Sequence, residues 1–120
     1  MILVDTSVWI DHLRSSNSRL VDLLNTGRVL VHPFVIGEIA LGNIKNRGAV
    51  LAGLVGMPQA PNVTSQEVLV FIETVKLAGL GVGYVDVHLL AAAKLAGANL
   101  WTRDKRVAAV AKRLGLGHGH

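Results

Sequence analysis

The stretch that decides the fold is Ile2-Leu3-Val4-Asp5, at the start of the 120-residue chain. Three apolar residues in succession, with no polar alternation, are typical of a strand buried on both faces of a parallel sheet. The acid stands directly after this run, at the end of the expected strand. In open α/β sheets, ligands bind outside the carboxyl ends of the strands. The opening stretch therefore predicts a parallel sheet with a carboxylate at its ligand-binding edge.

Short apolar runs recur along the chain, and helical patterns separate them. Residues 29–31 and 99–102 resemble the opening strand, and a weaker candidate surrounds Val63. Alternation of short strands with helices favours a parallel sheet covered by helices on both faces. The expected helices run from Thr6 or Ser7 as cap to Arg14, from Ser18 to near Gly27, from Pro33 to Leu41, from the capping box of Thr64 and Glu67 to near Gly79, from Val85 to Ala96, and from Asp104 onward.

Size and composition exclude several classes of protein. A chain of 120 residues fits one domain, so we expect a single domain over residues 1–120. With 51% hydrophobic and 17% charged residues, the chain is unlike disordered sequences. No apolar stretch reaches the roughly 20 residues of a membrane span, and the N-terminus lacks the basic region of a secretory signal. We therefore expect a cytoplasmic protein without a membrane segment.

The chain contains no cysteine, which excludes disulfides, thiolate zinc sites and cysteine nucleophiles. Any metal must therefore be held by oxygen or imidazole. The net charge is +4, from 12 Lys and Arg against 8 Asp and Glu. If four of the acids form one cluster, only four others oppose the twelve cations over the rest of the surface. Such a surface favours nucleic acid as a partner, although solubility alone explains the charge equally well.

Four acids are candidates for one shared site. Asp5 and Asp104 each follow a strand-like run, whereas Glu38 and Asp86 are isolated acids in apolar helical surroundings. A buried carboxylate is costly unless a cation or hydrogen-bond donors compensate for it. Mg²⁺ or Mn²⁺ prefers oxygen ligands and completes its shell with water or phosphate. The chemistry that follows is phosphodiester hydrolysis, with one metal ion or two.

Each acid also has a purely structural explanation. Asp5 and Asp104 can be helix N-caps, and Asp86 can lie in a first helical turn, where the helix dipole favours a negative charge. Taken singly, these acids fit the structural explanation better, and only Glu38 lacks a local partner. The metal site is predicted by the four acids together. An aspartyl-phosphate domain is disfavoured because Asp5-Thr6-Ser7 lacks the paired acids that such chemistry needs.

The chain resembles the VapC-type ribonuclease toxins of the PIN-domain superfamily over essentially all of its length. The resemblance lies in residues 1–10, the helix around Glu38, the helix Val85–Ala93 and the segment Leu100–Asp104. It implies a three-layer α/β/α PIN-like fold with a short parallel sheet. It also implies Mg²⁺ or Mn²⁺ as cofactor and endonucleolytic cleavage of RNA, as the toxin of a type II toxin-antitoxin pair.

The resemblance also assigns roles to residues and implies partners. Asp5, Glu38 and Asp86 would be the core catalytic and metal-binding acids, with Asp104 as the fourth. The supporting hydroxyl residues would be Thr6, Ser7 and Thr102. Toxins of this type are similar in forming homodimers and in being neutralised by a VapB-type antitoxin protein, whose C-terminal segment lies over the active site.

Other residues have two interpretations each. Arg103, Lys105 and Arg106 stand beside Asp104 and are candidates for RNA phosphate contacts, although a solvated helix face explains them equally well. We expect Trp9 and Trp101 in the core, Phe34 and Tyr84 packed or reaching a base, His88 as a structural histidine, and His118 and His120 in a frayed tail.

The alternative function is a non-catalytic module that binds RNA or a partner protein and keeps the PIN fold. Such a module would retain the acids for structure alone. Metal-dependent cleavage of RNA separates the two functions.

Overall fold

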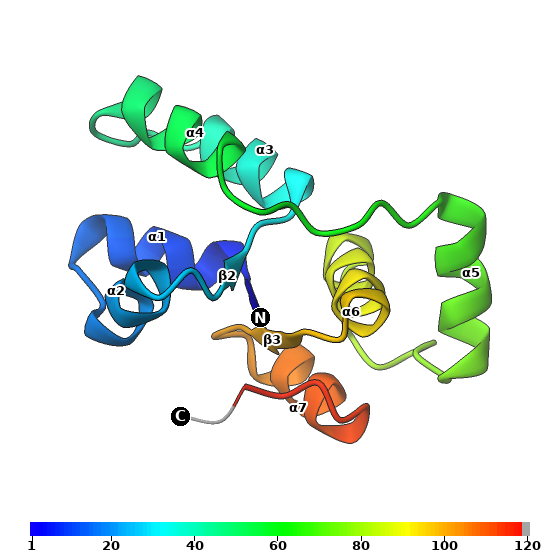
Figure 1. Ribbon diagram of the computed structural model, residues 1–120. Coiled ribbons are helices and arrows are strands. Elements are labelled where there is room, and N and C mark those ends of the chain that lie inside the picture. The colour runs from blue at the N-terminus through cyan, green and yellow to red at the C-terminus, as the bar shows by residue number, and fades with distance from the viewer. Residues whose placement is uncertain (119–120) are drawn as a thin grey trace.

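The computed structural model describes residues 1–118 (Figure 1). Its sheet has three parallel strands in the order β2-β1-β3. In the register, Leu3 lies between Leu30 and Leu100. Because all three strands run in the same direction, their carboxyl ends meet at one edge of the sheet. The strands are β1 (Ile2–Val4), β2 (Val29–Leu30) and β3 (Asn99–Trp101).

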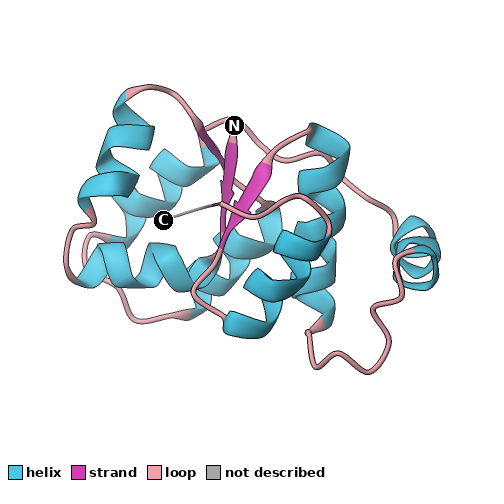
Figure 2. Ribbon diagram, turned by 90° about the horizontal axis from the view of Figure 1, so that it is seen from below, coloured by secondary structure: helices cyan, strands magenta, loops and turns pink. Residues whose placement is uncertain are grey.

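Helices cover both faces of this sheet, as Figure 2 shows with the strands between them. The predicted three-layer α/β/α fold with a short parallel sheet is therefore confirmed. Within the described residues, none of the helices is both long and apolar enough to cross a membrane. The helices are α1 (Thr6–Arg14), α2 (Ser18–Asn25), α3 (Pro33–Leu41), α4 (Arg47–Val55), α5 (Ser65–Thr74), α6 (Tyr84–Ala96) and α7 (Lys105–Arg113).

The core surrounds the central strand. Leu3 and Val4 are fully buried, and α6 contributes a continuous buried run from Val87 to Ala93. This run explains why the sequence of α6 is almost entirely apolar, without a polar stripe. Helix α7 buries one face, which carries Val107, Val110 and Ala111.

The fourth strand that we expected around Val63 is wrong. Residues 61–64 form no strand, because Pro61 has no N–H to donate and Thr64 already caps α5. The chain touches the sheet earlier, at Gln59, which forms an isolated parallel bridge with Val31. The neighbouring Ala60 N–H donates to the Val31 carbonyl at 2.7 Å.

Helix α4 was not predicted from the sequence. Its segment contains two glycines, and its N-cap Asn46 makes no side-chain cap but has a left-handed backbone, with φ of 52°. The helix is anchored instead by Arg47, whose guanidinium donates to the carbonyls of Ala40 and Gly42 at the end of α3. This anchor, whose acceptors lie five and seven residues before Arg47, replaces the side-chain cap that sequence analysis looks for.

Several element ends differ from the expected positions. The cap of α1 is Asp5 instead of Thr6 or Ser7, and the cap of α2 is Asn17 instead of Ser18. The capping box of Thr64 is confirmed. Helix α5 ends at Thr74, well before Gly79, because Lys76 adopts a left-handed conformation with φ of 57°.

The C-terminal segment is not frayed as far as residue 118. Gly117 forms a parallel bridge with Leu100, whose N–H donates to the Leu116 carbonyl at 2.7 Å. The ring of His118 lies 5.1 Å from the ring of Trp101. His120 lies outside the described residues.

Candidate functional site

Two of the candidate acids stand side by side at the carboxyl edge of the sheet. Asp5 follows β1 and Asp104 follows β3 after two residues, and the two strands are paired. The Asp5 N–H donates to the Trp101 carbonyl at 2.9 Å, which extends this pairing past the strand ends. Each acid then begins a helix as its N-cap. The strand-to-helix transitions thus position both carboxylates at one edge.

Asp5 is held rigidly by three donors. Its Oδ1 accepts from the Thr6 N–H at 2.7 Å, and its Oδ2 accepts from the hydroxyls of Ser7 at 3.0 Å and Thr102 at 2.8 Å. The residue is only 7% exposed. The hydrogen bonds offset the cost of burying this carboxylate and fix its orientation.

The same hydroxyl groups connect Asp5 to the rest of the site. The Thr102 hydroxyl accepts from the Asp104 N–H at 3.1 Å, and the Ser7 hydroxyl accepts from the Arg103 N–H at 3.1 Å. The Thr6 hydroxyl donates to Glu38 Oε1 at 2.7 Å. The structure therefore brings all three expected supporting residues together with the acids: Ser7 and Thr102 bind Asp5, and Thr6 binds Glu38.

Asp86 joins the group from the first turn of α6. Its Oδ2 accepts from the Gly83 N–H at 3.1 Å. Partial burial raises the pKa of Asp86, the Gly83 hydrogen bond lowers it, and the charges of the other three carboxylates raise it. Those three are Asp5, Asp104 and Glu38. The other three acids, which come from positions 5 to 104 of the sequence, are therefore close enough in space to repel the charge of Asp86.

Asp5, Asp86 and Asp104 do serve the starts of helices, yet three of the four acids use only one carboxylate oxygen. Asp104 caps α7 with Oδ1 alone, Asp86 uses Oδ2 alone, and Glu38 uses Oε1 alone. Within residues 1–118, the second oxygen of each accepts no hydrogen bond from the protein. Each carboxylate is thus oriented by one oxygen and has the other available.

This set of oxygens fits a hard divalent cation. In the described part of the chain, the one ion pair joins Arg103 to Asp11, so Lys and Arg neutralise none of the four acids. As the side chains stand in residues 1–118, no three acidic or imidazole groups converge closely enough to hold one ion. Mg²⁺ needs only one or two carboxylates and keeps several waters. The donor chemistry therefore suits such an ion, with water or phosphate completing its shell.

The three candidate RNA-contact residues point to two different places. Arg103 and Lys105 line one pocket beside Thr102. The Arg106 guanidinium lies instead against Gly81, where a Cβ would come within 2.7 Å of Arg106 Nη1. Gly81 has a left-handed backbone, with φ of 77°, which favours glycine there, whereas the flexible Arg106 side chain could move away from a Cβ.

The aromatic residues near the acids form a packed series. His88 is buried, and its ring lies 4.8 Å from Phe34 and 4.7 Å from Tyr84. Phe34 and Tyr84 are 41% and 51% exposed. This packing agrees with the expectation that His88 has a structural role. Trp9 and Trp101 are both buried, as we expected for core residues.

Sequence analysis missed the structural role of His32. It caps α3, with Nδ1 accepting from the Phe34 N–H at 3.0 Å. Burial lowers the pKa of His32 to about 4, and nearby His88 lowers it too. The available signal was its position directly before Pro33, because proline favours the first turn of a helix and the residue before it is then the N-cap.

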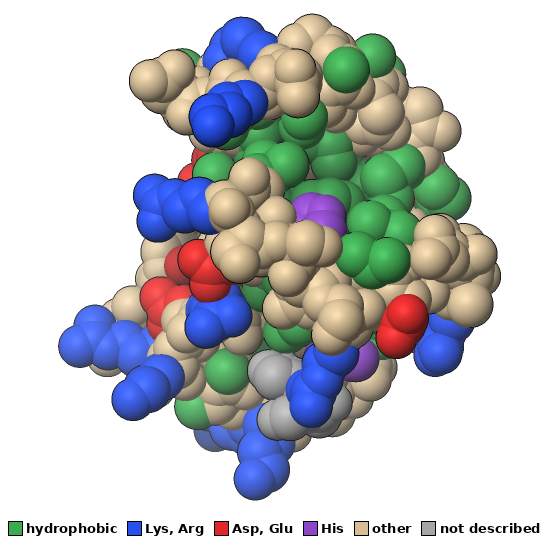
Figure 3. Space-filling view, turned by 90° about the vertical axis from the view of Figure 1, so that its left-hand side faces the viewer, with side chains coloured by type: hydrophobic (Ala, Val, Ile, Leu, Met, Phe, Trp, Pro, Cys, Tyr) green, Lys and Arg blue, Asp and Glu red, His purple; other side chains and the backbone are tan. Residues whose placement is uncertain are grey.

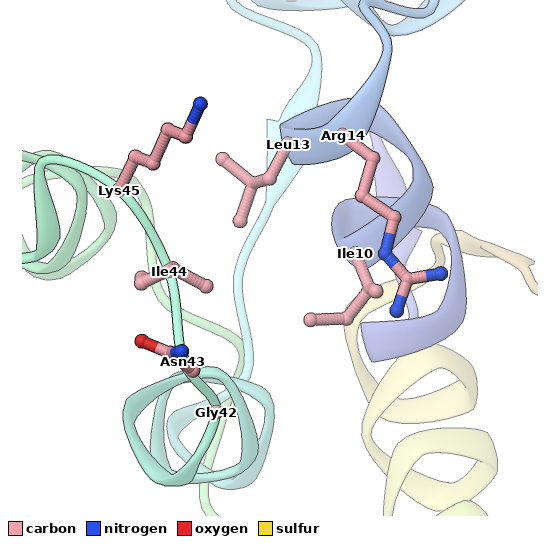
Figure 4. A pocket seen from close by; sticks show the side chains of 7 residues that line it. All are labelled: Ile10, Leu13, Arg14, Gly42, Asn43, Ile44 and Lys45. Carbon is pink, nitrogen blue, oxygen red and sulfur yellow. The ribbon is translucent and has the colours of Figure 1, made fainter.

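A separate hollow of about 430 Å³ lies between α1 and the α3–α4 connection. Figure 4 shows Ile10 and Leu13 projecting from α1 toward the segment that carries Ile44. Arg14 and Lys45 border it. None of the four candidate acids lines this hollow.

On the face of the molecule shown in Figure 3, Lys and Arg side chains spread over the left and lower parts, around exposed apolar side chains.

A short parallel α/β/α sheet with clustered acids at its carboxyl edge defines the class of PIN-type domains. The sequence profile described as the PIN domain matches residues 2–113, and the chain belongs to this family. It is 50% identical over 117 residues to the protein named Ribonuclease VapC32 in each of two strains of Mycobacterium tuberculosis. The alignment covers 97% of this chain and 94% of the relative. The resemblance to VapC-type proteins is therefore confirmed.

Proposed function

We propose that the chain is a metal-dependent endoribonuclease that hydrolyses RNA phosphodiester bonds. The observation that carries this proposal is the cluster of four acids, each oriented by the protein and three of them with a free oxygen. The relatives named Ribonuclease VapC32 support RNA as the substrate. The residues that would hold Mg²⁺ or Mn²⁺ are Asp5, Glu38, Asp86 and Asp104.

In this mechanism a bound divalent cation supplies Lewis-acid polarisation of the phosphate and neutralises the negative charge that develops during in-line displacement. The protein supplies orientation. Ser7 and Thr102 fix Oδ2 of Asp5, and Thr6 fixes Glu38. Because the hydroxyl groups of Ser7 and Thr102 are themselves held by the Arg103 and Asp104 N–H groups, Asp5 needs little reorganisation when the substrate arrives.

We also propose that the chain acts as the toxin of a type II toxin-antitoxin pair. Its partners would be a VapB-type antitoxin and a second copy of itself, as the identity to VapC-type relatives suggests. A single domain over residues 1–120 and a cytoplasmic location stay predictions.

A non-catalytic binding module is the second candidate function. The observation in its favour is that Asp5, Asp86 and Asp104 all serve the ends of helices. In that case the acids would be kept for folding, and divalent ions would support no cleavage.

The experiment that decides is incubation of the purified, antitoxin-free chain with a mixed RNA pool, with Mg²⁺ or Mn²⁺ and with EDTA. The test variant is Asp5→Asn, whose amide oxygen can still cap α1 at the Thr6 N–H. We expect metal-dependent cleavage by the wild type and a loss of about 100-fold or more in the variant, with a similar thermal unfolding midpoint.

The matched control is Asp22→Asn, which removes the same charge from an exposed position of α2. It should cleave like the wild type. Full activity of Asp5→Asn would contradict the site, and metal-independent cleavage by the wild type would contradict the cofactor. No cleavage under any condition, together with no metal binding in calorimetry, would favour the binding module.

A further inference from the structure

A basic pocket of about 490 Å³ borders the acid cluster, between the start of α2 and the β3–α7 connection. Three cationic side chains line it, from Arg19, Arg103 and Lys105. Thr102 lines the same pocket and donates its hydroxyl to Asp5 Oδ2 at 2.8 Å. One side chain therefore separates the pocket from the carboxylates.

The cationic side chains that line this pocket carry N–H groups that bind no acceptor within residues 1–118. Within residues 1–118, the side chains of Arg19 and Lys105 make no hydrogen bond or ion pair. Arg103 is held through Nε by Asp11 at 2.7 Å, which orients its guanidinium and leaves both terminal nitrogens free. Asn17 uses its side-chain oxygen to cap α2 at the Leu20 N–H, so its amide N–H₂ remains a donor.

Donors without acceptors, gathered beside a site that handles phosphodiesters, match the chemistry of one ligand class. Phosphate oxygens accept several hydrogen bonds at once, and arginine binds them with two parallel donors. The residues that line the pocket carry three positive charges and no negative one, and Asp11 pairs with Arg103 from outside it. An anionic phosphate group would offset part of this excess, whereas a neutral ligand would not.

We propose that this pocket is a phosphate subsite for the RNA strand, which holds a phosphodiester group next to the scissile one. The subsite rests on the proposed function, because it takes the same strand that the acids would cleave. Arg19 and Lys105 supply the charge, and Arg103 supplies the oriented donors. Contacts of this kind set the position of the strand without reading its bases.

The test is the affinity of a fluorescently labelled single-stranded RNA, measured by anisotropy in EDTA so that no cleavage occurs. The variant is Arg19→Gln, whose residue contacts none of the acids. The matched control is Arg28→Gln, which removes the same charge from an exposed position directly before β2, at the opposite edge of the sheet.

We expect Arg19→Gln to weaken RNA binding by about 5- to 10-fold at low salt and to reduce the slope of log affinity against log salt by about 0.7, the value for one lost phosphate contact on a single strand. Arg28→Gln should change the affinity less than about twofold. A DNA strand of the same sequence should show the same loss, because the subsite contacts only phosphates.

Equal affinities of the two variants would overturn the subsite and would leave the pocket available to an acidic protein segment. The absence of any RNA binding by the wild type would also overturn the subsite. The proposed function fails separately, in the cleavage assay. Cleavage by the wild type with equal binding by the two variants rejects the subsite alone. Selective loss of binding in Arg19→Gln without any metal-dependent cleavage rejects the nuclease alone.

Discussion

Thr102 joins two carboxylates of the site through one hydroxyl group. The hydroxyl donates to Asp5 Oδ2 at 2.8 Å and accepts from the Asp104 N–H at 3.1 Å. The side chain is 5% exposed, so water cannot easily replace either bond. Thr102 is therefore a positioning residue, because its hydroxyl group acts through Asp5 and Asp104.

Replacement of Thr102 by valine keeps the shape of the side chain and removes both hydrogen bonds. We expect Thr102→Val to lower the free energy of unfolding by about 1–3 kcal/mol, since it removes the acceptor of the partly buried Asp104 N–H and leaves Ser7 as the one hydroxyl donor to Asp5 Oδ2. Activity and metal affinity should fall by about 10- to 100-fold. Urea unfolding, RNA cleavage and Mn²⁺ calorimetry measure these effects.

The control is Thr102→Ser, which restores the hydroxyl and should recover most of the metal affinity. A structural role alone would lower stability and leave metal affinity at the wild-type value. That result in Thr102→Val would contradict the assignment of Thr102 as a positioning residue.

The sequence predicts which residues belong to the site better than it predicts which of them contact one another. Asp5 and Asp104 were predictable as neighbours because each follows an apolar run, and parallel strands end at one edge. The sequence contains no signal for which hydroxyl serves which acid. Thr6 and Ser7 are adjacent, yet one binds Glu38 and the other Asp5, because successive positions of a helix face about 100° apart.

At the scale of elements, the start of α3 contains a pH-sensitive contact. His32 is 3% exposed, and its Nδ1 must be unprotonated to accept the Phe34 N–H. Its pKa is about 4 in the folded chain and 6.5 when unperturbed. Only the unfolded chain therefore takes up a proton at His32 as the pH falls from about 6.5 to 4.

This difference predicts that stability decreases with acidification over that range. Above about pH 6.5 the contribution of neutral His32 is fully present, and near pH 4 on the order of 3 kcal/mol is lost. Urea unfolding at a series of pH values measures the loss. His32→Asn keeps a cap acceptor that does not titrate. Its stability should decline less steeply, and identical pH slopes for variant and wild type would contradict this account.

Elements were predictable where local chemistry determines them. The capping box of Thr64 and the proline of α3 are signals within four residues of the helix start. Helix α4 has no such signal, since its anchor is Arg47 bonded to carbonyls of the preceding helix. The strand expected at Val63 failed for a related reason, because a bridge between Val31 and Gln59 depends on tertiary packing.

At the scale of the whole molecule, the proposed metal site would couple metal binding to folding. Four carboxylates from four separate helix starts or helices meet only in the folded chain, so the unfolded chain offers no comparable site. An ion that binds the folded state alone stabilises it by an amount set by its concentration relative to Kd. Without an ion, folding brings the charges of the other three acids close to Asp86, and their repulsion lowers the stability of the folded chain.

Mn²⁺ should therefore raise the thermal stability of the chain. At a free concentration of about ten times Kd, the expected gain is about 1.4 kcal/mol, or roughly 5 °C in Tm for a domain of this size. Differential scanning fluorimetry with Mn²⁺ and with excess EDTA measures the shift. Asp22→Asn should show the full shift, because its charge lies outside the cluster. Asp5→Asn should lose most of the shift, measured against its own Tm in EDTA, because the variant also changes the hydrogen bonds of Oδ2. A full Mn²⁺ shift in Asp5→Asn would mean that the ion binds elsewhere on the molecule.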